Sequence, residues 1–276
     1  MMAGFTMRKS RYAAVAMMLL ATACSEGANT GPDAASSASL DLATVAADAT
    51  AEDVDVMVGM DGSLGSTDGS ALLLLNPPGR PGLTGCTFAA GAFDCPPVNR
   101  NGLTIDRTIV LKDAQGQAQA AYDELTTASV EVQASVEGSV TRGPWSADID
   151  RTRTFTISGL VGTETTRTVN GTGTADVSRS RHTGTDSVRS YDLVGTSVVA
   201  NVVVPVRAPG VVAWPISGTI TRTYTVTPTG SGGGSPFTRT IVITFNGTST
   251  VMATSNGEEF TIDLAARRAE RRERRG

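Results

Sequence analysis

The feature that most constrains this chain is an alternation of apolar and polar residues that begins after Gly102 and continues to about residue 264. In its first segment, Leu103, Ile105 and Ile109 fall on one side. Because successive side chains of a β-strand point to opposite faces, this spacing predicts strands with one apolar and one polar face. The apolar faces must be covered, either by a second sheet or by closure of the sheet on itself.

The alternation divides into about nine strands with short turns between them. The later strands are expected at residues 164–181, 187–204, 216–227, 237–246 and 249–264. The last of these contains Asn256-Gly257, a favoured hairpin turn. This order predicts an all-β fold, a single antiparallel meander that forms a barrel, a half-barrel or a sandwich. A short N-terminal helix is expected at residues 44–60, with Thr50 as its cap.

The polar face is rich in threonine. Thr219, Thr221, Thr223, Thr225 and Thr227 occupy every second position of one expected strand. Threonine is β-branched and polar, so it favours extended backbone and tolerates water. We therefore expect this face to be solvated and the opposite face to form the core.

Arginines interrupt the apolar face. Arg107 lies between Ile105 and Ile109 in the alternation. The same placement holds for Arg151, Arg153, Arg167, Arg222 and Arg239. A buried, unpaired guanidinium is very costly, so these groups must reach water, meet carboxylates or face a cavity. Two interpretations follow: a row at the rim whose charged ends reach water, or a cationic collar that binds an amphiphile with an acidic head.

The N-terminus has the pattern of an export signal. Arg8, Lys9 and Arg11 precede an apolar run at residues 13–20, which is too short to span a membrane. Small residues then lead to Cys24. The stretch Leu-Leu-Ala-Thr-Ala-Cys resembles the lipobox of bacterial lipoproteins, although Ala21 stands where Leu, Val or Ile is usual. The alternative is cleavage by an ordinary signal peptidase, which would leave a soluble exported protein.

The resemblance implies that the thiol of Cys24 is acylated and becomes the new N-terminus. The chain then divides into a signal peptide, a lipid-anchored flexible tether, a β domain and a disordered Arg-rich tail, at residues 1–23, 24–43, 44–266 and 267–276. The body is similar to lipoproteins of GC-rich bacteria in Cys95-Pro96-Pro97, Asn101-Gly102-Leu103-Thr104, the Thr-Arg-Thr strands and Phe245-Asn246-Gly247-Thr248. No activity is attached to that group, so the resemblance implies no site residues.

The two remaining cysteines form an even pair. Cys86 and Cys95 flank two short arms around Ala90-Gly91, which suits a hairpin bridged by a disulfide in an exported protein. The alternative is two free buried thiols. Metal binding is disfavoured, because two cysteines and one distant histidine lack the usual ligand set.

The charge of the chain and the motifs that it contains argue against several classes of function. The chain has 23 basic and 27 acidic residues. Loss of the three basic residues of the signal leaves 20 against 27, and six of those 20 lie in the last ten positions. The folded part is therefore acidic, which argues against nucleic-acid binding. No phosphate-cradling glycine loop is present, and we expect no cofactor.

Catalytic candidates are few. His182 is the sole histidine and continues the polar face, so no Ser-His-Asp or Cys-His arrangement has support. Asp148 and Asp150 share a face two residues apart and could serve a hydrolase as a carboxylate pair. We expect instead a non-enzymatic lipoprotein of the cell envelope, held to a membrane, that binds an acidic amphiphile through the six arginines. The main alternative is a passive structural or surface-presentation protein.

The lipid anchor predicts a clear effect of Cys24→Ser. Without the thiol of Cys24, no acyl chain can be attached there. The protein then loses its membrane anchor, because stable membrane attachment needs two or more acyl chains. We expect metabolic labelling with a fatty acid to disappear and the protein to move to the soluble fraction. Unchanged membrane retention of the variant would contradict the anchor.

Overall fold

The structure is a computed structural model, and all the residues that it describes belong to the unit formed by residues 33–276. These residues are 42, 46, 50, 83, 85–100, 102–142, 145–162, 164–183, 187–206, 213–229, 234–255 and 257–266. The expected signal peptide, the expected tether as far as residue 41 and the expected tail from residue 267 lie outside the described residues. Most of the helix expected at residues 44–60 also lies outside the described residues.

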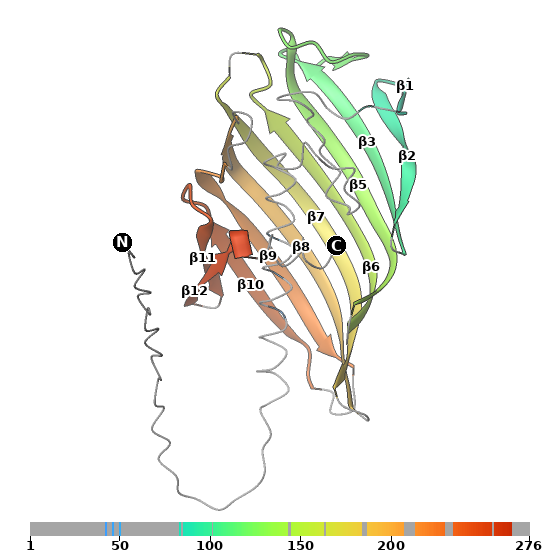
Figure 1. The fold of residues 1–276 in the computed structure, drawn as a ribbon, viewed down its shortest axis with the longest axis vertical. Coiled ribbons are helices and arrows are strands. Elements are labelled where there is room, and N and C mark those ends of the chain that lie inside the picture. The colour runs from blue at the N-terminus through green and yellow to red at the C-terminus, as the bar shows by residue number, and fades with distance from the viewer. Residues whose placement is uncertain are drawn as a thin grey trace, which may run out of the picture. The chain divides into compact units, whose positions relative to one another are not determined.

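Twelve strands form one antiparallel sheet (Figure 1). They are β1 (Thr87–Ala89), β2 (Ala92–Arg100), β3 (Leu103–Asp113), β4 (Ala118–Gln119), β5 (Thr127–Arg142), β6 (Trp145–Ser158), β7 (Thr166–Thr183), β8 (Ser187–Pro205), β9 (Ser217–Pro228), β10 (Phe237–Thr244), β11 (Thr250–Ser255) and β12 (Glu258–Asp263). Each strand pairs with the next in sequence, except that β4 pairs only with β3 and β5 follows β3 in the sheet. The all-β meander is thus confirmed.

The sheet is open, with β1 at one end of its strand order and β12 at the other. The described residues form twelve strands where about nine are expected from the sequence. The additional strands include β1 and β4, which are too short to show alternation. Figure 1 shows that the long strands from β3 to β10 curve together. The expected hairpin near residue 256 is confirmed, since Ser255 pairs with Glu258 and Gly257 has a φ of 86°.

The two faces of the sheet differ as the alternation predicts. The apolar face carries buried side chains that include Ile109, Val132, Phe155, Ile157, Ile220 and Ile243. The opposite face, called the threonine face, carries a cross-strand row on β6 to β10 that consists of Thr152, Thr174, Thr196, Thr223 and Thr240. In that row Oγ1 of Thr152 lies 2.7 Å from Oγ1 of Thr174. Hydroxyl pairing of this kind suits a solvated sheet surface.

Two helical residues belong to the same core as the apolar face. Leu42, Ala46 and Thr50 are helical and buried, and Leu42 and Ala46 belong to the core cluster of the sheet. The prediction that Thr50 caps a helix is wrong. Its Oγ1 donates a hydrogen bond of 2.7 Å to the carbonyl of Ala46, whereas a cap side chain accepts one from the first turn. The helix has therefore already begun at Ala46.

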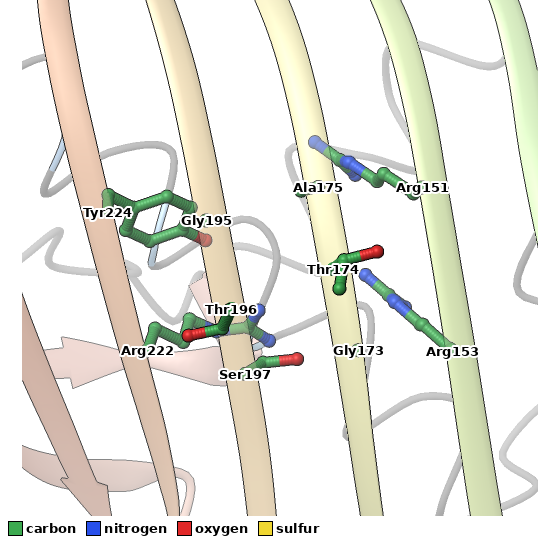
Figure 2. Close-up of a pocket in the computed structure, with 10 residues that line it drawn as sticks. All are labelled: Arg151, Arg153, Gly173, Thr174, Ala175, Gly195, Thr196, Ser197, Arg222 and Tyr224. Atoms are coloured by element: carbon green, nitrogen blue, oxygen red, sulfur yellow. The ribbon is translucent and has the colours of Figure 1, made fainter.

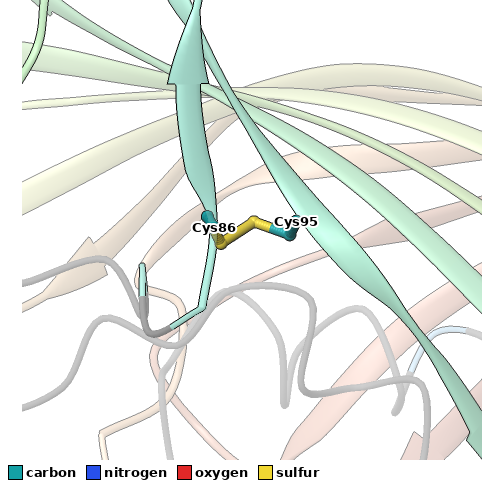
Figure 3. Close-up of a disulfide and its surroundings, with 2 residues drawn as sticks. All are labelled: Cys86 and Cys95. Carbon is teal, nitrogen blue, oxygen red and sulfur yellow. A yellow bond between two sulfur atoms is a disulfide. The ribbon is translucent and has the colours of Figure 1, made fainter.

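The cysteine hairpin is confirmed. Cys86 and Cys95 form a disulfide that ties the start of β1 to β2 (Figure 3). Ala90 and Gly91 connect the strands with φ values of 50° and 85°, which is the pattern of a two-residue hairpin turn with both central residues left-handed. The disulfide lies at the edge of the sheet, where the short strand β1 has few residues that can pair with β2.

Neighbouring residues on β6 test the two-faced sheet. Ile157 is 1% exposed on the apolar face, whereas Thr156 is exposed on the other. Ile157→Ala should lower the free energy of unfolding by about 2–5 kcal/mol, because it leaves a cavity. Thr156→Ala should change it by less than about 1 kcal/mol. Urea unfolding measures both, and equal losses would contradict the assignment of faces.

Candidate functional site

Two neighbouring cross-strand rows on the apolar face, here called the arginine rows, collect five of the six arginines that the sequence indicates. One row consists of Arg151, Ala175, Gly195, Tyr224 and Arg239, on β6 to β10. The other consists of Arg107, Ala134, Arg153, Gly173, Ser197 and Arg222, on β3 and β5 to β9. Each residue lies directly opposite the next, so the register brings together side chains that are far apart in the sequence.

The arginine rows cross the middle of the sheet. An apolar row lies on one side of them and consists of Ile149, Val177, Leu193, Val226 and Phe237. The row on the other side includes Ile109, Val132, Phe155, Val199 and Ile220. The two arginine rows together therefore lie between apolar rows of the sheet.

Small residues on β7 and β8 make room for the large side chains of the neighbouring strands. A Cβ added to Gly195 would lie 2.5 Å from Cδ1 of Tyr224, so the ring lies against this glycine. A Cβ on Gly173 would lie 3.2 Å from Cγ of Arg153, whose stem crosses the same strand. In Figure 2, Arg151 and Arg153 reach from β6 over β7, while Arg222 reaches from β9 over β8. Arg151 and Arg153 thus extend side by side from one direction, and Arg222 extends over the middle strands from the other.

A small hollow lies between these side chains. Arg151, Arg153, Arg222, Gly173, Gly195 and Tyr224 contribute to its lining. Its volume of about 20 Å³ is enough for roughly one water molecule. Arg222 is only 4% exposed, and Arg151 and Arg153 are half-buried. The arrangement therefore concentrates positive charge in a largely desolvated place, where electrostatic interactions are stronger than in water.

The rows themselves contain no carboxylate. Burial lowers the pKa of the Arg107 guanidinium below its usual value, because desolvation disfavours the charged form. The arginines of the rows all engage other groups. Carboxylates of the sheet lie on the threonine face instead, where Glu137, Asp150 and Asp176 are consecutive members of one cross-strand row. The arginine rows and this acidic row thus lie on opposite faces of the sheet.

Arg167 lies apart from the rows. Its Nη1 donates a hydrogen bond of 2.7 Å to the carbonyl of Gly159, in the connection between β6 and β7. Burial lowers the pKa of Arg167, and electrostatic interactions with Tyr122 and Glu164 oppose that shift. The contact indicates that this arginine fixes a turn. Arg239, at the end of its row, lies with Cζ 5.1 Å from the ring centroid of Phe237.

Among the residues whose side chains the structure describes, sequence reasoning missed two arginines of the apolar face. Arg179 lies opposite Ala147 and Tyr191, and Arg181 lies opposite Trp145. Both are half-buried. The alternation in the sequence does indicate them, because Arg179 and Arg181 continue the odd-numbered positions of β7 that also hold Val177. They extend the basic side chains along β7 toward the end of the sheet.

The catalytic candidates lie away from the hollow. Asp148 and Asp150 are exposed on the threonine face, where Asp148 accepts a hydrogen bond from Ser139. His182 belongs to β7 opposite Val188, and its side chain is outside the described part of the structure. Within the described residues, no group of three or more His, Cys, Asp or Glu side chains is placed to hold a metal ion. The described residues also include no helix of the length and hydropathy needed to cross a membrane.

Comparison with protein-family models, curated proteins and solved structures finds no match to this chain. What the arrangement can do chemically must therefore be argued from its own residues. Converging guanidinium groups recognise carboxylates and phosphates, whose planar or multiple oxygens match their donors.

The close approach of Tyr224 to Gly195 predicts that Gly195→Ala destabilises the protein. The added methyl group would displace the ring, which should lower the free energy of unfolding by about 1–3 kcal/mol. Gly234→Ala is the control, because a Cβ there meets only Cγ of Pro228 at 3.8 Å. That variant should be unchanged or up to about 1 kcal/mol more stable, since it restricts the unfolded chain. Thermal or urea unfolding measures the stability of both variants. Equal effects of Gly195→Ala and Gly234→Ala would contradict the close approach of Tyr224 to Gly195.

Proposed function

We propose that this chain is an exported, lipid-anchored protein of the bacterial cell envelope, without enzymatic activity, whose arginine rows bind the acidic head of an amphiphile. The observation that carries the proposal is the gathering of Arg151, Arg153 and Arg222 around one hollow over the small residues of β7 and β8. Guanidinium groups that approach one another repel, and a shared anion relieves that repulsion. Binding of a carboxylate or phosphate is the function that this geometry supports best.

The apolar rows on either side support an amphiphile over a simple anion. Val177 and Leu193 lie on one side of the arginine rows, and Phe155 and Ile220 lie on the other. A ligand whose acidic head met the guanidinium groups would place its hydrocarbon tail against one of these rows. The hollow of about 20 Å³ is too small for an acyl chain, so the tail must displace groups that pack there.

The second candidate is a passive protein that presents its threonine face to partners. It is favoured by the close packing of the apolar face, where Ile220, Ile243 and Val130 are fully buried. It is also favoured by the exposed hydroxyls of Thr152, Thr174 and Thr196. This candidate requires no ligand on the arginine rows, so a binding measurement separates the two.

Dodecyl phosphate is a suitable probe, because it combines one acidic head with one hydrocarbon tail. We expect calorimetric titration of the full-length protein to show binding, and Arg151→Gln and Arg153→Gln each to weaken it about tenfold. A hydrogen bond to a charged group contributes about 1.5–3 kcal/mol, and 1.4 kcal/mol corresponds to tenfold. Lys112→Gln is the control, since Lys112 pairs with Glu131 at 2.7 Å on the threonine face.

Two outcomes contradict the proposal. Absence of binding to the wild-type protein would favour the passive candidate. Binding that neither arginine variant weakens would place the ligand elsewhere. Dodecyl maltoside, which has the same tail and an uncharged head, should bind more weakly than the phosphate if the guanidinium groups select the head.

A further inference from the structure

The turn between β1 and β2 holds an alanine in a backbone conformation that alanine disfavours. Ala90 has a φ of 50°, in the left-handed region, and Gly91 follows with a φ of 85°. A two-residue hairpin turn of this type needs positive φ at both central residues, so it favours Asn-Gly, Asp-Gly or Gly-Gly. In alanine, the left-handed conformation brings Cβ too close to the following carbonyl oxygen. The turn is therefore strained at Ala90, and the strain would be relieved if the chain straightened there.

The strand that this turn joins to the sheet is short and lies at the end of the strand order. β1 consists of Thr87–Ala89, its three residues are all exposed, and within the described sheet it pairs only with β2. The ring centroid of Phe88 lies 4.9 Å from that of Phe93 on β2. A short turn under strain favours domain swapping, in which identical elements are exchanged between two copies of a chain. The geometry of β1 meets this condition.

The register of the hairpin shows what a swapped pair would look like. Three pairs of residues lie opposite one another across the turn: Thr87 and Asp94, Phe88 and Phe93, and Ala89 and Ala92. If the turn opened, residues 86–95 would form one extended strand, and two such strands could pair antiparallel. Each β1 would meet β2 of the other copy in the same register, and Ala90 would lie opposite Gly91 of that copy. The pairs of the hairpin would be kept, and Ala90 would adopt extended backbone.

The disulfide between Cys86 and Cys95 prevents the turn from opening (Figure 3). These cysteines are nine positions apart in the chain and continue the register of the hairpin at its open end. A strand rises about 3.4 Å per residue, so an open turn would place the two cysteines of one chain roughly 30 Å apart. The bond within one chain therefore excludes the extended strand. In a swapped dimer, Cys86 of each copy would instead lie opposite Cys95 of the other.

We propose that this chain exchanges β1 with a second copy of itself when the disulfide is reduced. The oxidation state of Cys86 and Cys95 then controls whether the protein is a monomer or a domain-swapped dimer. The reductant is a dithiol: thiol–disulfide exchange breaks the bond between the two sulfur atoms, leaves two thiols and converts the dithiol to a disulfide. The proposal goes beyond the proposed function and does not depend on it, because the exchange needs no ligand.

Two single-cysteine chains test the exchange without any reductant. Both are full-length and carry Cys24→Ser, so that no third thiol interferes, and one carries Cys86→Ser whereas the other carries Cys95→Ser. Neither can form the disulfide within its own chain. When the two are mixed and then oxidised in air, exchange of β1 brings Cys95 of the first opposite Cys86 of the second. We expect a disulfide-linked heterodimer on a non-reducing gel. A mixture that gives no more linked dimer than either chain alone would overturn the proposal.

Variants of the turn test whether strain at Ala90 drives the exchange. They are made in the full-length Cys24→Ser chain that keeps Cys86 and Cys95, and are reduced with dithiothreitol. Ala90→Gly should lower the dimerisation constant about tenfold, because glycine adopts positive φ without the steric cost that alanine has. Ala90→Val should raise it, because a β-branched residue favours extended backbone. Ala89→Gly is the control and should leave the constant unchanged, since residue 89 pairs with Ala92 in both the monomer and the dimer.

Size-exclusion chromatography with light scattering measures the monomer and dimer fractions over a range of protein concentrations. Without dithiothreitol, the chain that keeps both cysteines should remain a monomer. Equal dimerisation constants for Ala90→Gly and Ala90→Val would overturn the proposal. So would a reduced Ala90→Val chain that remains a monomer at every concentration.

Discussion

The register of the antiparallel ladder is the constraint on which the rest of this structure depends. Side chains of a strand alternate between faces, so a slip of one residue in any pair would move a whole set of side chains to the other face. Arg107 and Arg222 belong to strands that are distant in the chain, yet an unbroken series of opposed pairs from β3 to β9 places them in one row. The arginine rows exist only because every intervening pair keeps this register.

Glycine on the middle strands has a packing role. Glycine weakens a strand, since it loses more conformational freedom on folding and offers no side chain to pack. Here a neighbouring side chain fills each space: Phe155 lies against Gly171 as Tyr224 lies against Gly195. Aromatic rings that cover glycine on an adjacent strand offset this loss. The same two strands thereby leave space for guanidinium groups to extend across them.

Much of the fold could be predicted from the sequence, because period-two alternation is a local signal. The faces of β6 and β9 follow directly from it, as do the hairpin at Cys86 and Cys95 and the apolar side of each arginine. Whether the sheet closes could not be predicted, because closure depends on the shear accumulated over all strands. The irregular pairings between Val169 and Gly171, and between Ala200 and Val203, change that shear.

The candidate site was predictable in composition but not in arrangement. The alternation indicates that Arg151, Arg153 and Arg222 share a face, but only the register shows that they meet. Arg167 obeys the same sequence rule and yet bonds the carbonyl of Gly159, because it lies near a turn. A local pattern assigns a residue to a face, whereas its neighbours on that face depend on turn lengths and bulges elsewhere.

The arginine rows and the row of exposed carboxylates lie on opposite faces of the sheet, and the two faces differ in how well water screens charge. Carboxylates such as Glu137, Asp150 and Asp176 are exposed, so water and salt screen their mutual repulsion. Arg222 lacks that screening because it is nearly fully buried. The cost of bringing like charges together is therefore much greater on the apolar face than on the threonine face. An acidic group on the same face, such as the head of the proposed ligand, would reduce this cost.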